Sequence, residues 1–134
     1  MKLSSKTIAA LKMFIDLGEH YEEGFVSLID VARRKDLSKK FLEQIVPIYK
    51  ANGLLLCSRG KQGGYRLAKE AKDISLKDIL SPSESLFQDE AIDDPVLWKT
   101  FEDFDEVASS YFGGITLASL VEKQKEEYAN SYMI

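Results

Sequence analysis

Cysteine and histidine are nearly missing from the 134-residue sequence, which has only Cys57 and His20. A single cysteine excludes an internal disulfide and is typical of a reducing compartment, so we expect a cytoplasmic protein. A lone histidine supplies neither a catalytic triad nor a zinc site. The sequence also has no glycine-rich phosphate loop ahead of a helix, and we therefore expect neither an enzyme nor a bound cofactor or metal.

Long apolar runs are missing as well. The longest one is too short for a membrane-spanning helix, which needs ~20 residues. The first residues lead into a helical pattern that contains Lys12 and Asp16, instead of the apolar stretch of an export signal. We therefore expect neither secretion nor a membrane partner.

Basic residues are scarce in one part of the chain only. The overall net charge is −4, but residues 1–80 contain 15 Lys and Arg against 10 Asp and Glu, whereas residues 81–134 contain 3 against 12. Within 33–72 there are 11 basic and 3 acidic residues. A polyanion would meet such a local excess of positive charge, although a solvated basic face without a ligand gives the same count. Composition leaves both interpretations open.

Apolar periodicity predicts a mainly α fold with a small β-hairpin wing. Helices are expected over 5–20, about 28–35 and 38–50. Ser27 opens a capping-box pattern at the second helix, and Ser38 is well placed as the N-cap of the third.

The same spacing predicts which side chains are buried. In the first helix it predicts a broad buried face, made up of Ile8, Leu11, Ile15 and Gly18 and widened by Met13, Phe14 and Leu17. The inward residues of the third helix are expected to be Leu42, Ile45 and Tyr49. Pro47 lies inside that helix. An interior proline removes one hydrogen bond at a cost of ~3 kcal/mol, so we expect a kink or an early tightening there.

After the turn at 52–53 the apolar period changes from 3.6 to 2. This change predicts a β-hairpin over 54–67 with a glycine-rich, basic tip at 59–64. A second capping-box pattern at Ser75 begins a short helix to about residue 80. Three helices followed by a two-stranded wing are the order of a winged helix-turn-helix, in which the third helix enters the DNA major groove.

The remaining chain is predicted to be a linker and a pairing module. Residues 81–95 contain two prolines and five acidic residues, which is typical of a linker loop. Apolar residues then follow at spacings of 4, 3, 4 and 3, as in the heptad seam of a long dimerisation helix. The seam residues are Leu97, Phe101, Phe104, Ala108 and Tyr111, with Trp98 beside them. We divide the chain into a winged helix-turn-helix domain at 1–80, an acidic linker at 81–95 and a helical dimerisation region at 96–134.

Several motifs in this order resemble the Rrf2 family of bacterial winged helix-turn-helix regulators. They are Ser38-Lys39-Lys40-Phe41-Leu42-Glu43-Gln44, Asn52-Gly53-Leu54 and Arg59-Gly60-Lys61-Gln62-Gly63-Gly64-Tyr65-Arg66-Leu67. Shorter matches at 1–4, 74–76 and 115–118 extend the resemblance over most of the chain. The resemblance implies a homodimer, joined through the helix near 98–111, that binds a DNA operator and usually represses transcription.

The best-known sensing device of this family is an iron–sulphur cluster, held by three cysteines in the loop before the dimer helix. The matching stretch here, 81–98, contains no cysteine, and Pro95 stands where a cluster-binding member has a histidine ligand. The resemblance therefore implies a regulator without the cluster. Carboxylates in the loop could hold a hard cation, but a solvated linker is the favoured interpretation.

Candidate DNA contacts lie in the first helix, at the start of the third helix and at the hairpin tip. They are Ser5, Lys6, Ser38, Lys39, Lys40, Glu43, Gln44, Arg59, Gly60, Lys61, Gln62 and Gly63. The cations among them are expected to meet phosphates. Glu43 could accept a hydrogen bond from a cytosine amine, or it could form an ion pair with Lys39. The resemblance favours the base-reading role.

Two alternatives stand beside this hypothesis. Cys57 could be a redox trigger if the nearby Arg59 favours its thiolate, but an inert, half-buried thiol is the favoured interpretation. The whole chain could instead be a winged-helix scaffold that binds a protein partner through its acidic loop and C-terminal helix. The effector of a regulator of this kind, a small molecule or a protein, is left open by the sequence.

Overall fold

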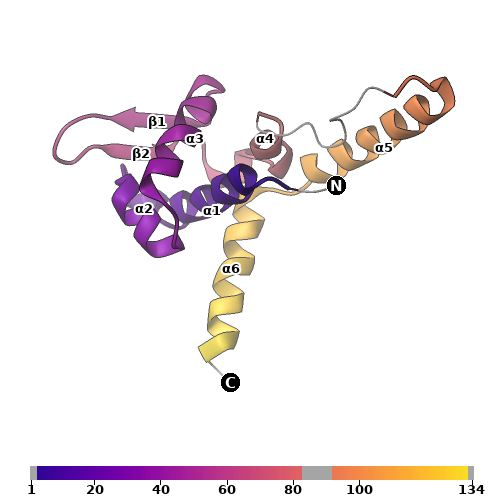
Figure 1. Ribbon diagram of the computed structural model, residues 1–134. Coiled ribbons are helices and arrows are strands. Elements are labelled where there is room, and N and C mark those ends of the chain that lie inside the picture. The colour runs from indigo at the N-terminus through magenta and orange to yellow at the C-terminus, as the bar shows by residue number, and fades with distance from the viewer. Residues whose placement is uncertain (1–2, 83–91, 133–134) are drawn as a thin grey trace.

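The computed structural model describes residues 3–82 and 92–132, and it is mainly helical with one antiparallel hairpin, as the sequence predicts (Figure 1). The helices are α1 (Ser5–Glu19), α2 (Leu28–Lys35), α3 (Lys39–Ala51), α4 (Leu76–Leu80), α5 (Pro95–Gly113) and α6 (Leu117–Tyr132). The hairpin strands are β1 (Leu55–Ser58) and β2 (Gly64–Leu67), and two 3₁₀ turns are η1 (Tyr21–Glu23) and η2 (Ala71–Asp73).

Serine hydroxyls define where the first four helices begin. Ser4, Ser27, Ser38 and Ser75 stand at the N-caps, and each side-chain oxygen accepts a hydrogen bond from the backbone N–H three residues later, at 3.0–3.2 Å. The Asp78 carboxylate also accepts from the backbone N–H of Ser75 at 2.9 Å, which completes the predicted capping box there. Each cap satisfies an amide that would otherwise lack a partner in the first turn.

The buried face of α1 is broad, as predicted, but it is centred on the residues that were expected at its edge. Its buried apolar side chains are Ala9, Ala10, Met13, Phe14 and Leu17. The prediction for Ile8 is wrong, because this side chain is 43% exposed, and Leu11 and Ile15 are only partly buried. The physical reason is that α1 is contacted by α2, α3, β2 and α6 together, which centres its core face on Met13, Phe14 and Leu17 and leaves Ile8 at the surface.

Helix α3 confirms its predicted inward face, since Leu42, Ile45 and Tyr49 are fully buried. The Tyr49 ring meets Phe14 edge-on at 5.0 Å between centroids, and its hydroxyl donates to the Ile79 carbonyl at 2.8 Å. Instead of tightening at Pro47, α3 continues as one α-helix to Ala51. Pro47 is exposed, so water can reach the carbonyl that loses its partner there.

The hairpin is fixed to the helices through the backbone. Leu55 pairs with Leu67 on its buried face, and Val26 forms a bridge with Tyr65, with N–O distances of 2.8 and 2.9 Å. This bridge requires a close approach at Gly64, where an added Cβ would lie 2.2 Å from the Val26 carbonyl oxygen. The base of the wing is thereby held against the segment that leads into α2.

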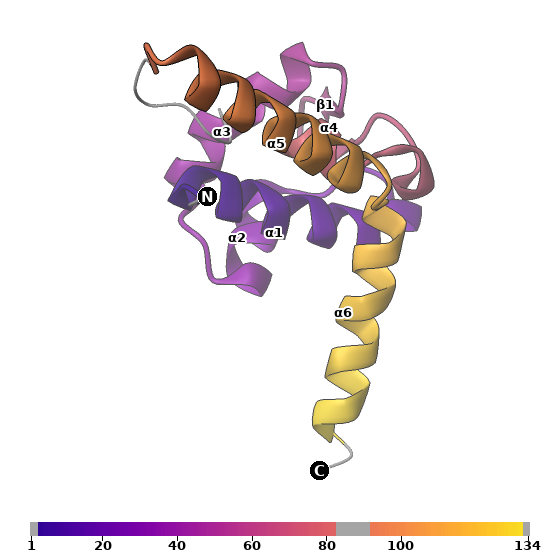
Figure 2. The same cartoon turned by 90° about the vertical axis from the view of Figure 1, so that its right-hand side faces the viewer.

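The helices α5 and α6 leave the helical body in different directions, as Figures 1 and 2 show. Pro95, predicted to end the linker, is the first residue of α5, and Asp94 caps that helix through the N–H groups of Val96 and Leu97. The central part of the predicted linker, 83–91, lies outside the described residues.

The start of α6 is packed into the body of the protein. Leu117 and Val121 belong to the same core as the side chains of α1, and the Leu117 N–H donates to the Ile74 carbonyl at 2.8 Å. The division at 1–80, 81–95 and 96–134 stays a prediction. No helix within 3–82 or 92–132 combines the length and the apolar character that crossing a bilayer requires.

Candidate nucleic-acid interface

The start of α3 presents polar side chains to solvent. Lys39, Lys40, Glu43 and Gln44 are all exposed in its first two turns, whereas the opposite side of the helix is in the core. Ser38 is exposed too, but its hydroxyl oxygen is occupied as the N-cap acceptor for the Phe41 N–H at 3.2 Å. The inward residues thus anchor α3 and leave its charged side available to a ligand.

The hairpin tip projects beyond the helices (Figure 1). Its predicted contact residues Arg59, Gly60, Lys61 and Gln62 are exposed, and the Gly63 N–H closes the turn by donating to the Gly60 carbonyl at 3.0 Å. An added Cβ at Gly63 would lie 2.3 Å from the Ser58 carbonyl oxygen, so the tight turn excludes any larger residue there.

The predicted DNA-contacting cations of α1, α3 and the hairpin tip differ in whether they form ion pairs. Within the part of the chain that the structure describes, Lys6, Lys40, Arg59 and Lys61 form no ion pair. Lys39 does, because its Nζ lies 3.4 Å from Oε1 of Glu43, the alternative that the sequence left open. Ser5 and Lys6 are exposed in the first turn of α1. The role of every one of these residues in DNA binding stays a prediction.

Part of the basic segment 33–72 is used inside the fold. Arg34 makes two charge-assisted hydrogen bonds to Asp16, Nε to Oδ1 and Nη2 to Oδ2, both at 2.8 Å. The Asp16 side chain is only 1% exposed, and its hydrogen bond raises the pKa of Arg34. Lys35 Nζ lies 3.3 Å from Glu19 Oε1. The charge count therefore overstates the positive surface, because these two cations neutralise carboxylates of α1.

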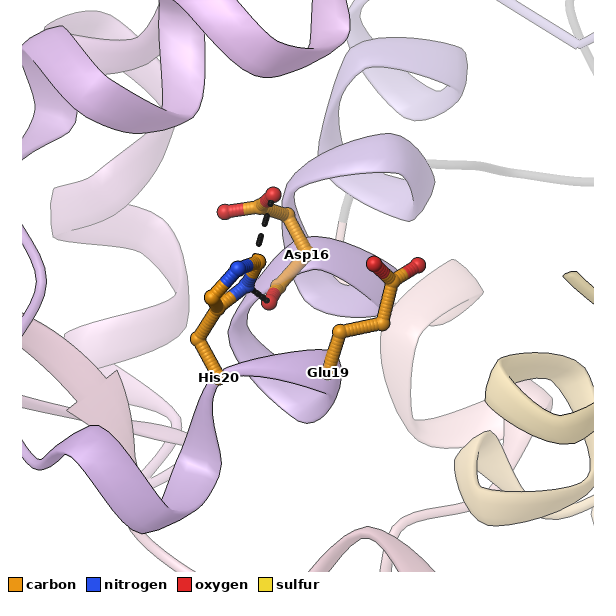
Figure 3. Close-up of side chains that lie close together, drawn as sticks. All are labelled: Asp16, Glu19 and His20. Carbon is orange, nitrogen blue, oxygen red and sulfur yellow. Dashed lines mark hydrogen bonds and ion pairs between the residues drawn. The ribbon is translucent and has the colours of Figure 1, made fainter. Parts of the chain in front are cut away.

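Asp16, Glu19 and His20 lie close together at the end of α1, with one potential ligand atom from each within 4.8 Å of the others (Figure 3). Their geometry fits an ion-pair cluster better than a metal centre. Arg34 engages both Asp16 oxygens, Lys35 holds Glu19, and His20 Nδ1 lies 2.8 Å from the Asp16 backbone carbonyl oxygen. A cation would have to displace two protein cations to bind here.

Cys57 lies in β1, half-buried, with Tyr65 as its cross-strand neighbour. Burial raises the pKa of the Tyr65 phenol, and the Cys57 side chain and the charge of Glu43 add to this effect. The predicted neighbour Arg59 lies beyond the end of β1. A redox role for Cys57 stays a prediction.

The surroundings of Arg66 were not predicted from the sequence. Its guanidinium lies 4.9 Å from the ring centroid of Tyr21 and 5.6 Å from that of Phe25. Such cation–π contacts orient the guanidinium over the two rings, although they do not neutralise its charge. The only sequence signal was its position in β2 on the face opposite Leu67, which does not reveal aromatic partners that are distant along the chain.

Known proteins of similar sequence and structure agree with this architecture. The family model Rrf2, described as "Iron-dependent Transcriptional regulator", matches residues 3–123. The HTH-type transcriptional regulator IscR of Serratia proteamaculans is 33% identical over 92% of this chain and 81% of its own length. The solved structure of T. potens IscR has a TM-score of 0.80 and 33% identity, covering 95% of this chain and 90% of that one. CymR, the global cysteine regulator of B. subtilis, has a TM-score of 0.79 and 28% identity, covering 92% and 98%.

The residues of this chain do not fit an iron–sulphur cluster. Iron–sulphur clusters require several thiolates, and the sequence has one cysteine, placed in the hairpin. The helices, the wing and the motif residues of α3 do fit, and the proteins of this group are transcription regulators and not enzymes. The chain therefore belongs to the Rrf2 family of winged helix-turn-helix transcriptional regulators.

Proposed function

We propose that this protein is a cytoplasmic, sequence-specific DNA-binding repressor that acts as a homodimer without an iron–sulphur cluster. The observation that supports this best is the set of unpaired cations on one module. Lys40 at the start of α3 and Arg59 and Lys61 at the wing tip are exposed, and none has a carboxylate partner among the described residues. Exposed cations without a carboxylate partner are available to neutralise phosphates.

Helix α3 enters the major groove, and the wing tip follows the DNA backbone. The rigid attachment of α3 through Leu42, Ile45 and Tyr49 supports this role, since base reading requires side chains on a fixed element. Glu43 and Gln44 read base edges, because a carboxylate accepts from cytosine and an amide pairs with adenine. Lys6 in α1 adds a phosphate contact.

Dimerisation takes place through α5. Leu97, Trp98, Phe101, Phe104 and Tyr111 are 44–67% exposed, and Ala108 is half-buried. A helix of 19 residues without a single buried residue needs a partner to cover its apolar side. The heptad spacing fits a second copy of the same helix, which would place two α3 helices about 34–36 Å apart on a near-palindromic operator.

The protein represses by occupying its operator, and the signal that it senses is not an iron–sulphur cluster. The cysteine content supports this, since the single thiol of Cys57 cannot hold an iron–sulphur cluster. The alternative scaffold function would leave the exposed cations of α3 and the wing tip without a purpose.

Selection from random DNA duplexes tests the proposal. The full-length protein is mixed with the duplex pool at physiological salt, and bound molecules are separated, amplified and sequenced. We expect a near-palindromic motif with two half-sites one helical turn apart. A variant with Lys40→Ala, Arg59→Ala and Lys61→Ala, checked for an unchanged circular dichroism spectrum, should enrich no motif. If the unmodified protein also enriches none, with an affinity no better than ~10⁻⁴ M, the scaffold function is correct instead.

A further inference from the structure

Helix α3 begins with two neighbouring lysines, of which only the first forms an ion pair. Lys39 Nζ lies 3.4 Å from Oε1 of Glu43, whereas Lys40 pairs with no carboxylate of the described chain. Both lysines are exposed, with 51% of the Lys39 side chain accessible, so burial does not explain the difference. The spacing does, because residues four apart lie on one side of a helix and Glu43 is four residues after Lys39.

The pair contributes little to folding. With side chains 51% and 52% exposed, it is screened by water and salt, and pairs of this kind change an equilibrium by about twofold. The order of the two charges, with lysine nearer the helix N-terminus, is also the less favourable one for the helix dipole. Its main consequence is therefore geometric, since it biases the orientation of the Glu43 carboxylate.

Glu43 lies on α3, and its charge also acts on Tyr65 at the base of the wing. Its charge contributes to the raised pKa of Tyr65, an effect that burial dominates, and Tyr65 is fixed to Val26 by two backbone hydrogen bonds of 2.8 and 2.9 Å. The Glu43 carboxylate therefore has Lys39 on one side and the base of the wing in its electrostatic neighbourhood. The orientation of the Glu43 carboxylate matters because Glu43 is the acidic residue of α3 that is proposed to contact a base.

We propose that Lys39 is a positioning residue for base selection, which holds the Glu43 carboxylate in its reading orientation, and that it is not a phosphate contact. This inference rests on the proposed function, in which α3 reads the major groove. It revises the expectation from the sequence, which grouped Lys39 with Lys40 as phosphate-binding cations. The two lysines thus have separate tasks, Lys40 for affinity and Lys39 for selectivity.

The two roles differ in their salt dependence. A lysine that neutralises a phosphate releases condensed counterions, so removing it makes the slope of log affinity against log salt shallower by about 0.9. A lysine already neutralised by Glu43 releases few, so Lys39→Ala should change the slope by clearly less than Lys40→Ala. Conversely, Glu43→Ala frees Lys39 and should make binding to all duplexes more salt-dependent.

The experiment compares variants on the selected duplex and on three duplexes in which the base facing Glu43 is replaced. The variants are Lys39→Ala, Lys39→Arg, Glu43→Ala, Lys39→Ala with Glu43→Ala, and Lys40→Ala as the matched control. Alanine favours helices, so these exposed substitutions leave α3 intact. We expect Lys39→Ala to reduce base discrimination by about twofold and Lys39→Arg to retain it. In the Glu43→Ala background, Lys39→Ala should cause no further loss of base discrimination.

One pattern overturns the role of Lys39 alone: the unmodified protein selects a motif, but Lys39→Ala weakens all four duplexes equally and makes the slope shallower by about 1.8 for the two copies in a dimer, as Lys40→Ala does. Lys39 would then be an ordinary phosphate contact. If the unmodified protein selects no motif, the proposed function fails, and the positioning role fails with it. Competitive binding followed by sequencing measures all four duplexes in one tube and resolves a twofold difference.

Discussion

Helices α3 and α5 have similar amphipathic patterns and very different surroundings. In α3 the apolar residues Leu42, Ile45 and Tyr49 are fully buried within the same chain. In α5 the apolar residues Leu97 and Phe101 are 51% and 44% exposed, and no residue of the helix is buried. One helix has its partner in its own fold, whereas the other presents an apolar side to solvent.

This contrast indicates that α3 and α5 have different functions. Because α3 is held by its core, its outward charges stand on a rigid base, which suits the reading of a fixed DNA surface. Because no residue of α5 is buried, we expect a partner that covers its apolar side to stabilise it. Substitutions in each region should therefore have different consequences, and the loss of dimerisation should be the largest of them.

Phe101→Asp should disrupt the proposed dimerisation through α5. Each dimer would lose two apolar side chains, worth about 1.5–3 kcal/mol apiece, and would bring two charges into the interface, so the dimer Kd should rise at least about 100-fold. Sedimentation equilibrium measures this Kd, with a change from a dimer toward the 15.1 kDa monomer. Glu106→Ala, off the heptad seam of α5, is the control and should stay dimeric. An unmodified protein that sediments as a monomer would refute the interface.

Leu42→Ala should destabilise the fold itself. Removing a fully buried leucine side chain from the core costs about 2–5 kcal/mol, so the free energy of unfolding should fall by that amount. Urea denaturation at one fixed protein concentration measures the change. Leu56, 48% exposed in β1, is the matched control, and Leu56→Ala should cost about 0.5 kcal/mol or less. Equal losses for the two variants would contradict the described core.

Gly64→Ala should detach the wing from the helices. The new Cβ would collide with the Val26 carbonyl, so the bridge between Val26 and Tyr65 must open, at a cost of about 1–3 kcal/mol. Thermal unfolding measures the loss, and DNA affinity should fall with it. Gly113→Ala is the control, because the nearest atom to its added Cβ is the flexible Lys77 side chain at 3.8 Å. A Gly64→Ala protein as stable as this control would show that the bridge is dispensable.

Lys61→Ala should weaken DNA binding without changing selectivity. Each phosphate that a lysine no longer neutralises makes the slope of log affinity against log salt shallower by about 0.9, and a dimer has two copies of Lys61. Fluorescence anisotropy titrations over a salt series measure this slope, with Lys123→Ala on α6 as a control of equal charge change. A changed base preference in Lys61→Ala would assign the wing tip to base reading instead.

Cys57→Ser should have the smallest effect. The thiol is half-buried beside Tyr65 and takes no part in the proposed contacts, so operator affinity should stay within about twofold, before and after peroxide treatment. Anisotropy titrations with and without oxidant measure it. If peroxide releases the unmodified protein from DNA and Cys57→Ser prevents the release, the redox role is correct.

Local signals in the sequence predicted much of this fold. The N-caps at Ser27, Ser38 and Ser75 and the change of period after Gly53 indicated the order of the helices and the wing, because these features depend on neighbouring residues only. The inward face of α3 followed from the same periodicity. The motif residues of α3 and the wing tip then carried the family resemblance.

Contacts between distant segments could not be predicted in this way. The pairing of Arg34 with Asp16 joins two helices across 18 positions, and it changes a cation that had been counted as surface charge into one that neutralises a buried carboxylate. The exposure of Ile8 depends on which elements cover α1. Such features arise from tertiary packing, which periodicity along one helix does not encode.

The salt dependence of operator binding by the unmodified protein tests the central claim most directly, namely that uncompensated cations on α3, the wing and α1 neutralise DNA phosphates. Lys6, Lys40, Arg59 and Lys61 give four such cations in each protomer and eight in a dimer, so log affinity against log salt should fall with a slope of about −7. A slope shallower than about −2 would contradict the account, because most of these cations would then contact no phosphate.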